Sequence, residues 1–232
     1  MKLVRRAVIP ALAVWGLTVQ AAPPEDVKLT YDVSYNGMVL GEIVETLEHD
    51  NRTYSITSIG RGRGILAIAP VLKRTSRGRI TPQGLRPNEF RDQRGERFVL
   101  TAKFDWAARS VTQDKNGKNP ETFPMPAAAA QDPLSLTYSF AFFPPIEKAF
   151  EVVQAEGRWR LNRLRFTVVG TETLQTPAGE MQTLHISKER DGPGDKATDI
   201  WFASERSYLP VRILVVDKDG TRVDQILTRL GN

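Results

Sequence analysis

The residues best placed to do chemistry lie in one basic stretch of the chain. Between Asn51 and Asn88 the sequence has no Asp or Glu, but it has eight Lys and Arg residues. The middle of this stretch, residues 64–72, is almost wholly apolar and has cations on both sides. Such a segment suits an interface where acyl chains meet phosphates, since each cation near an anionic surface adds about 1 kcal/mol. We therefore hypothesise that six residues contact a lipid, an anionic glycolipid or a membrane surface: Arg61, Arg63, Lys73, Arg74, Arg77 and Arg79.

An ordinary structural role would explain the same stretch. Residues 64–72 would then be a buried strand or a short helix, and the arginines would line the solvated face of a strand. The alternating glycines from Gly60 to Gly64 resemble a phosphate-binding loop, but a dinucleotide fingerprint needs a following helix and an acid about 20 residues on. The next acid is Glu89 and Pro70 interrupts any helix, so we expect these glycines to mark a bend or a β-bulge.

Patterns typical of catalysis or metal binding are missing from the sequence. The chain has no cysteine and two histidines, His49 and His185, which are far apart and lack a patterned partner. Neither a nucleophile elbow nor a carboxylate pair at a recognisable spacing is present. We therefore expect no enzymatic activity, no metal site and no cofactor, and structural roles for both histidines.

The first 21 residues predict a cleaved signal peptide. Lys2, Arg5 and Arg6 precede an apolar run over residues 7–19, and small residues follow near Ala21. The run is shorter than the roughly 20 apolar residues of a transmembrane helix, and no cysteine follows it to carry a lipid anchor. We expect export to the periplasm of a soluble chain covering residues 22–232, without a transmembrane segment.

The mature chain is close to electrically neutral. Three of the 32 Lys and Arg residues lie in the leader, which leaves 29 cations against 27 Asp and Glu residues. This balance argues against general polyanion binding, and the basic stretch contains no motif that reads nucleic acid. The sequence therefore predicts no nucleic-acid partner.

Alternating apolar and polar residues predict strands along most of the chain. Residues 27–35 are apolar at every second position, and Asn36-Gly37 follows, a hairpin signal because both turn positions favour positive φ. Further strands are expected at residues 38–48, 53–59, 98–106, 159–169, 181–187, 196–203, 210–216 and 221–230. Many strands with short turns predict one all-β domain, a large curled antiparallel sheet in the form of a β-roll or half-barrel.

Two segments depart from this pattern. Residues 119–131, rich in Pro and Ala, predict a loop. Asp132 as N-cap and Pro133 at the first helical position then predict one short helix that ends at about Phe142. This helix is apolar on most sides, so we expect it to be buried against the sheet or to plug the mouth of the curl.

Several phrases of the sequence resemble the DUF3108 family of exported bacterial proteins. They are Tyr31-Asp32-Val33-Ser34-Tyr35, Asp132-Pro133-Leu134-Ser135-Leu136, Val169-Gly170-Thr171-Glu172, Thr176-Pro177-Ala178-Gly179, Ile200-Trp201-Phe202-Ala203 and Tyr208-Leu209-Pro210-Val211. The resemblance covers nearly the whole mature chain and consists of turn and strand signatures. It implies an exported, β-rich and largely uncharacterised protein, periplasmic in Gram-negative bacteria, and it supplies no catalytic residues.

Two non-enzymatic function classes follow from these observations. One is a protein that binds or carries an apolar or amphipathic envelope component, a lipid or a glycolipid. The other is a structural or assembly partner that docks another envelope protein along a sheet edge. A continuous apolar cavity would favour the carrier, and a filled interior with an unpaired edge strand would favour docking. An envelope hydrolase is a third class, disfavoured because no catalytic arrangement is visible.

The aromatic residues bear on this choice, because they either line a cavity or fill the core. The residues concerned are Trp106, Phe140, Phe142, Phe143, Trp159, Trp201 and Phe202. A domain without disulfides depends on apolar burial for its stability, so we expect them to fill the core.

Overall fold

Strands of one continuous sheet account for most of the chain. The computed structural model describes residues 23–96, 98–125, 130–143, 148–156, 160–190, 192 and 194–231, so the predicted signal peptide and Trp159 lie outside the described residues. The N-terminal half is an antiparallel meander of β1 (Asp26–Tyr35), β2 (Met38–His49), β3 (Thr53–Gly62), β4 (Leu72–Thr81), β5 (Gly84–Arg94), β6 (Phe98–Asp105), β7 (Ser110–Lys115) and β8 (Glu121–Pro124).

The C-terminal half supplies the remaining strands of the same sheet and the α-helix. Its elements are β9 (Ala130–Gln131), α1 (Pro133–Phe142), β10 (Ala149–Ala155), β11 (Leu161–Thr176), β12 (Gly179–Lys188), β13 (Ala197–Ala203), β14 (Leu209–Val216) and β15 (Arg222–Gly231). The first strand, β1, pairs with both β2 and β15, so the two halves meet in the middle of the sheet. Every described strand pair is antiparallel except β9 with β10.

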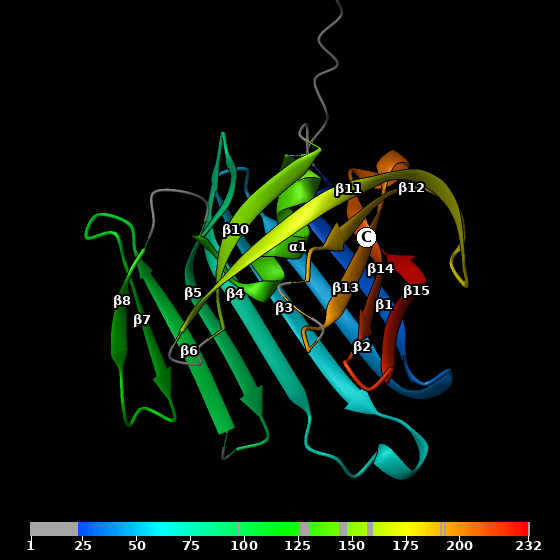
Figure 1. The fold of residues 1–232 in the computed structure, drawn as a ribbon, viewed down its shortest axis with the longest axis horizontal. Coiled ribbons are helices and arrows are strands. Elements are labelled where there is room, and N and C mark those ends of the chain that lie inside the picture. The colour runs from blue at the N-terminus through cyan, green and yellow to red at the C-terminus, as the bar shows by residue number, and fades with distance from the viewer. Residues whose placement is uncertain are drawn as a thin grey trace, which may run out of the picture.

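The predicted all-β class and curled antiparallel sheet are confirmed. The sheet bends around α1, with β10 and β11 crossing over one side of the helix and β3–β5 lying on the other (Figure 1). Gln131 on β9 donates a hydrogen bond to the carbonyl of Leu85 on β5 (2.8 Å), which ties one end of the sheet across the curl to a strand of the N-terminal half. The loop predicted for residues 119–131 is wrong at Glu121–Pro124, which pair with β7, and at Ala130–Gln131, which pair with β10. Residues 126–129 of this prediction lie outside the described residues.

The helix begins where the sequence predicts it. Asp132 accepts hydrogen bonds from the backbone N–H groups of Leu134 and Ser135 (both 2.9 Å), and the Ser135 hydroxyl accepts the Asp132 N–H in return. This capping box satisfies donors that the first helical turn would otherwise leave unpaired. Pro133 fits at the first position because its missing N–H would have no partner there.

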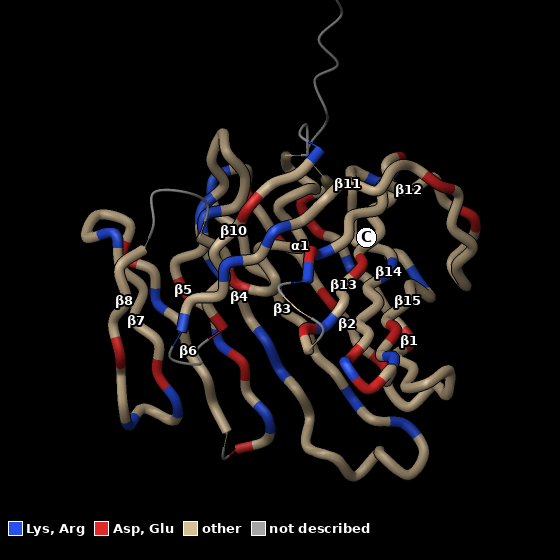
Figure 2. The backbone as a smooth tube through the Cα atoms, in the orientation of Figure 1, with Lys and Arg blue, Asp and Glu red and all other residues tan. Residues whose placement is uncertain are grey.

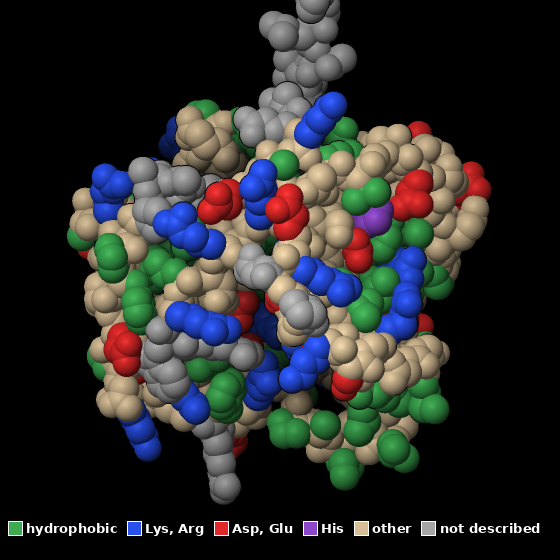
Figure 3. Space-filling view, in the orientation of Figure 1, with side chains coloured by type: hydrophobic (Ala, Val, Ile, Leu, Met, Phe, Trp, Pro, Cys, Tyr) green, Lys and Arg blue, Asp and Glu red, His purple; other side chains and the backbone are tan. Residues whose placement is uncertain are grey.

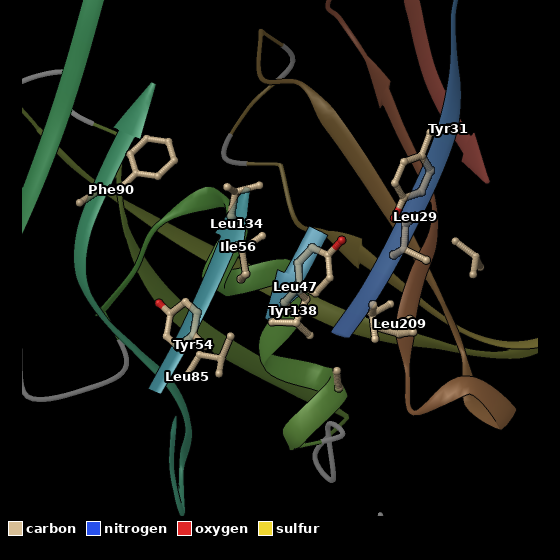
Figure 4. Close-up of a cluster of buried hydrophobic side chains, with 14 of the residues drawn as sticks. Leu29, Tyr31, Leu47, Tyr54, Ile56, Leu85, Phe90, Leu134, Tyr138 and Leu209 are labelled. Atoms are coloured by element: carbon tan, nitrogen blue, oxygen red, sulfur yellow. The ribbon is translucent and has the colours of Figure 1, made fainter. Parts of the chain in front are cut away.

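The helix is buried on both sides, as its apolar sequence predicts. Leu134, Tyr138 and Ala141 pack into a core cluster with side chains of β1, β2, β3 and β5, including Leu29, Leu47, Ile56 and Phe90 (Figure 4). Leu136 and Phe140 pack into a second cluster with β10–β13, where Phe140 lies 4.6 Å from Phe202 between ring centroids. The expectation that aromatic side chains fill the core is confirmed for Phe140, Trp201 and Phe202, whereas Phe143 is exposed.

Buried polar groups fix the position of α1 against the sheet. The Tyr138 hydroxyl donates to Glu45 Oε2 (2.8 Å), and Ser58 donates to Glu45 Oε1 (2.9 Å). At the start of the helix Ser76 donates to Asp132 Oδ2 (2.6 Å), and the Tyr54 hydroxyl lies 3.0 Å from Ser76 Oγ. Because buried polar groups without partners are costly, these bonds favour one placement of the helix.

The Asp132 carboxyl should make stability depend on pH. Burial raises its pKa from 3.8 to about 6, so the folded state favours the protonated form. The contribution of Asp132 to stability is therefore full below about pH 4 and falls as the pH rises to about 6, by ~3 kcal/mol at about 1.4 kcal/mol per pKa unit. Asn at position 132 can still cap the helix but does not ionise. The free energy of unfolding of Asp132→Asn, measured by urea titration, should therefore rise relative to that of wild type as the pH increases from about 4 to about 6.

Asp50→Asn serves as the control with the opposite sign. Asp50 is exposed and accepts hydrogen bonds from the N–H groups of Arg52 and Thr53, which lower its pKa. Wild type should therefore gain stability relative to this variant as the pH rises. A difference between Asp132→Asn and wild type that stays constant from pH 4 to pH 7 would contradict the assignment.

Candidate functional site

The apolar run of the basic stretch lies in an exposed connection between β3 and β4. It contains one turn of 3₁₀ helix, Gly64–Leu66, in which no residue is buried. The side chains of Ile65 and Ile68 are 86% and 95% exposed, and Leu66 and Val71 are 40% and 44% exposed. The alternative interpretation of a buried strand or helix is therefore wrong for residues 64–71. Large exposed apolar side chains that lie together mark interaction sites.

The glycines of this stretch shape the connection, as predicted. A Cβ on Gly62 would lie 1.9 Å from the carbonyl oxygen of Leu66, so only glycine lets the loop fold back onto the strand end. Gly64 has φ +58°, a left-handed conformation that glycine adopts at little cost. The two residues thus hold Ile65 and Ile68 away from the sheet.

Neighbouring turns extend the apolar surface along one end of the sheet. The Arg63 N–H donates to the Leu40 carbonyl (2.8 Å), the Asn36 N–H to the Arg222 carbonyl (2.8 Å) and the Gly95 N–H to the Val71 carbonyl (3.2 Å). These bonds tie together the turns that carry further exposed apolar side chains. We call the whole set the apolar rim, and it consists of Tyr35, Met38, Val39, Ile65, Leu66, Ile68, Val71 and Val223.

The figures place the apolar rim at the lower end of the molecule. Hydrophobic side chains gather there at the β3–β4 connection (Figure 3). Residues 64–71 of the connection carry no charge, and Lys and Arg lie on both sides of them (Figure 2). Sequence reasoning missed the members outside residues 64–71. The position of Met38 and Val39 directly after the Asn36-Gly37 turn was the signal that could have indicated apolar side chains at this end of the sheet.

The six predicted contact cations do not form one group. Arg61 and Lys73 are exposed and flank the apolar connection. Arg63 is neutralised locally, because its guanidinium bonds Asp32 (2.7 Å) and Glu42 (2.6 Å). Arg77 and Arg79 lie on the outer face of β4 towards its far end, where they are in register with Ser55 and Thr53.

Arg74 differs from its neighbours because it faces the interior of the curl. Strand side chains alternate between faces, so Arg74 shares the inner face with the buried Ser76, opposite to Lys73 and Arg77. Its Nε lies 3.5 Å from Oδ2 of Asp92, which is buried. Arg94, which sequence reasoning also missed, lies 3.4 Å from the same oxygen.

His185 is held on the outer face of the C-terminal half. Its ring stacks on Trp201 with centroids 4.3 Å apart. Its Nε2 lies 3.0 Å from Asp199 Oδ1, and its Nδ1 lies 3.3 Å from Glu172 Oε1. Each ring nitrogen of His185 therefore has a carboxylate beside it, and the structural role expected for this histidine stays a prediction.

An open polar cleft of about 580 Å³ lies at the opposite end of β2–β4 from the apolar rim. Its lining includes Glu48, His49, Tyr54 and Arg77. The His49 Nε2 is 3.0 Å from the Pro23 carbonyl oxygen, and its ring meets Phe142 edge-on at 5.0 Å. His49 therefore packs the N-terminal segment against the end of α1.

The described residues contain neither a cluster of metal-binding side chains nor a helix that could span a membrane. No group of three His, Cys, Asp or Glu residues in the described part of the chain could hold a metal ion. None of the helices found there has the length and apolar character needed to cross a membrane.

Comparison with known proteins identifies a family and a fold. Residues 30–227 match the family model described as "Protein of unknown function (DUF3108)". No curated protein matches the sequence. Among solved structures, a beta-barrel-like protein of domain of unknown function DUF1849 from Brucella abortus is 11% identical with a TM-score of 0.58, covering 91% of this chain and 99% of that one.

Two further solved structures are similar at lower scores. One is titled a "putative exported protein with YmcC-like fold" from Bacteroides fragilis, 12% identical, covering 90% of this chain and 96% of that chain with a TM-score of 0.40. The other is titled a "putative lipoprotein" from Parabacteroides distasonis, 12% identical, covering 91% and 96% with a TM-score of 0.40. At 11% identity, the likeness to the Brucella abortus protein concerns the fold alone.

Two isoleucines test whether the apolar connection contributes to folding. Ile68 is 95% exposed and Ile56 is fully buried in the core. Ile68→Ala should change the free energy of unfolding by less than about 0.5 kcal/mol, whereas Ile56→Ala should cost about 2–5 kcal/mol. Denaturant unfolding measures both, and a large loss in Ile68→Ala would show that residues 64–71 are packed.

Proposed function

This chain belongs to the DUF3108 family, and we propose that it is a periplasmic, non-enzymatic protein that attaches to an anionic membrane surface through its apolar rim. The observation that carries the proposal is the exposure of Ile65 and Ile68 on a connection flanked by Arg61 and Lys73. The predicted signal peptide supports the compartment.

The energetics favour a membrane as the occupant of this surface. Removing an isoleucine side chain from water contributes about 1.5–3 kcal/mol. Each cation near an anionic lipid surface adds about 1 kcal/mol, and this attraction weakens as salt screens it. The exposed isoleucine side chains would contact the acyl chains of such a surface, and the cations beside them would contact its phosphates.

Two other roles have less support in the fold. A carrier with an enclosed cavity has to accommodate α1, whose side chains pack into the core clusters on both sides of the curl. Docking along a sheet edge would use β8, of four residues, β9, of two residues, or the part of β10 that β9 does not cover. Short edge strands offer little backbone for pairing with another chain.

Vesicle co-sedimentation tests the proposal. Wild type should pellet with vesicles of phosphatidylethanolamine and phosphatidylglycerol, less with pure phosphatidylcholine, and less as salt rises. The double variant Ile65→Ser/Ile68→Ser should reduce the partition coefficient at least tenfold, because two buried side chains are lost. Val169→Ser is the matched control, since Val169 is 59% exposed on β11 away from the rim. Equal pelleting of the double variant and wild type would refute the role of the rim.

A further inference from the structure

A charged row crosses the inner face of the sheet below α1. Glu45, Ser58, Arg74 and Asp92 are consecutive register partners across β2, β3, β4 and β5. The row nearer the rim consists of Ile43, Gly60, Leu72 and Arg94. The charged groups therefore lie inside the curl, between the core under α1 and the apolar rim.

The hydrogen bonding of this row is incomplete. Asp92 Oδ2 lies near both Arg74 Nε (3.5 Å) and Arg94 Nη2 (3.4 Å), so two guanidinium groups share one carboxylate oxygen. The buried atoms Arg74 Nε and Asp92 Oδ1 have no hydrogen-bond partner. A buried polar atom left without a partner destabilises the folded state. One unmatched donor on a cation and one unmatched acceptor on a carboxylate thus lie beside each other.

Glu45 does not supply the missing partner. Its two oxygens already accept hydrogen bonds from Tyr138 and Ser58. Burial raises the pKa of the Glu45 carboxyl, and both Arg74 and Arg94 lie against Asp92. The row therefore suits an anion that also carries a hydroxyl group.

The arginine side chains beside this row are partly exposed and lie close to the rim. The side chains of Arg74 and Arg94 are 32% and 45% exposed. Along β4, Arg74 is three residues beyond Val71 of the rim, which corresponds to about 10 Å at about 3.3 Å per residue. A phosphate attached to acyl chains at the rim would reach Arg94 first and Arg74 next.

We propose that Arg74, Arg94 and Asp92 form a binding site for a hydroxyl-bearing phosphate headgroup, such as phosphoglycerol. The guanidinium groups bond the phosphate oxygens, and Asp92 Oδ1 accepts a bond from the hydroxyl. This site deepens the proposed membrane attachment and rests on it, because the rim brings the headgroup to the mouth of the curl. Arginine is suited to this role by its planar array of donors.

Binding of soluble ligands tests the site separately from attachment. Dihexanoylphosphatidylglycerol below its micelle concentration and glycerol 3-phosphate are each titrated by calorimetry or NMR, with dihexanoylphosphatidylcholine as the comparison lipid. We expect binding of the phosphatidylglycerol, and binding of glycerol 3-phosphate as well if a free phosphate ester suffices. Arg94→Gln and Arg74→Gln should each weaken binding at least tenfold. Arg77→Gln, on the opposite face of β4, should stay within twofold of wild type.

The outcomes separate the site from the rim. If Arg94→Gln binds dihexanoylphosphatidylglycerol as tightly as Arg77→Gln, or if the phosphatidylcholine lipid binds equally well, the headgroup site is refuted while vesicle attachment stands. If the arginine variants lose soluble binding but wild type fails to pellet with vesicles, attachment is refuted and the site stands. If Arg74→Gln does not fold, the binding measurement on Arg94→Gln tests the site, because Arg94 is the more exposed of the two residues.

Discussion

The hydrogen bond from the Tyr138 hydroxyl to the buried Glu45 carboxylate holds the structure in its observed form. It joins the middle of α1 to the middle of β2, while the Ser76–Asp132 bond joins the start of the helix to β4. The strands alternate apolar and polar side chains, so the inner face of the curl is the one that must be buried, and the apolar helix α1 covers part of it. The position of α1 therefore decides which part of the inner face is core and which part stays open.

This division separates the molecule into a stable end and an interactive end. Beside α1, the strands present Leu47, Ile56 and Phe90, which are fully buried or nearly so. One inner row further along, β4 carries Arg74, and in the row after that β5 carries Arg94. Substitution of the exposed apolar side chains is therefore decoupled from folding, a separation that lets a binding surface change without loss of the scaffold.

The sequence predicts most of the elements and less of the site. The β1–β2 hairpin follows from Asn36-Gly37, and α1 follows from Asp132-Pro133, because both signals act through local backbone geometry. The β8 strand at Glu121–Pro124 was missed because its pairing with β7 is what stabilises it. An apolar run such as residues 64–71 has no period that distinguishes a buried strand from an exposed loop. Similarly, the placement of Lys73 and Arg74 on opposite faces can be predicted only once β4 is known to be a strand.

The pairing of β1 with β15 has a consequence for how the chain folds. The Thr228 hydroxyl donates to the Thr30 carbonyl across 198 positions, because the strand made last is a neighbour of the strand made first. The sheet therefore cannot be assembled in order of synthesis, since its centre stays split until β15 has been made. Such distant pairing slows folding. A chain that stops short of β15 loses a central seam and leaves β1 with a bare edge, the kind of edge on which aggregation begins.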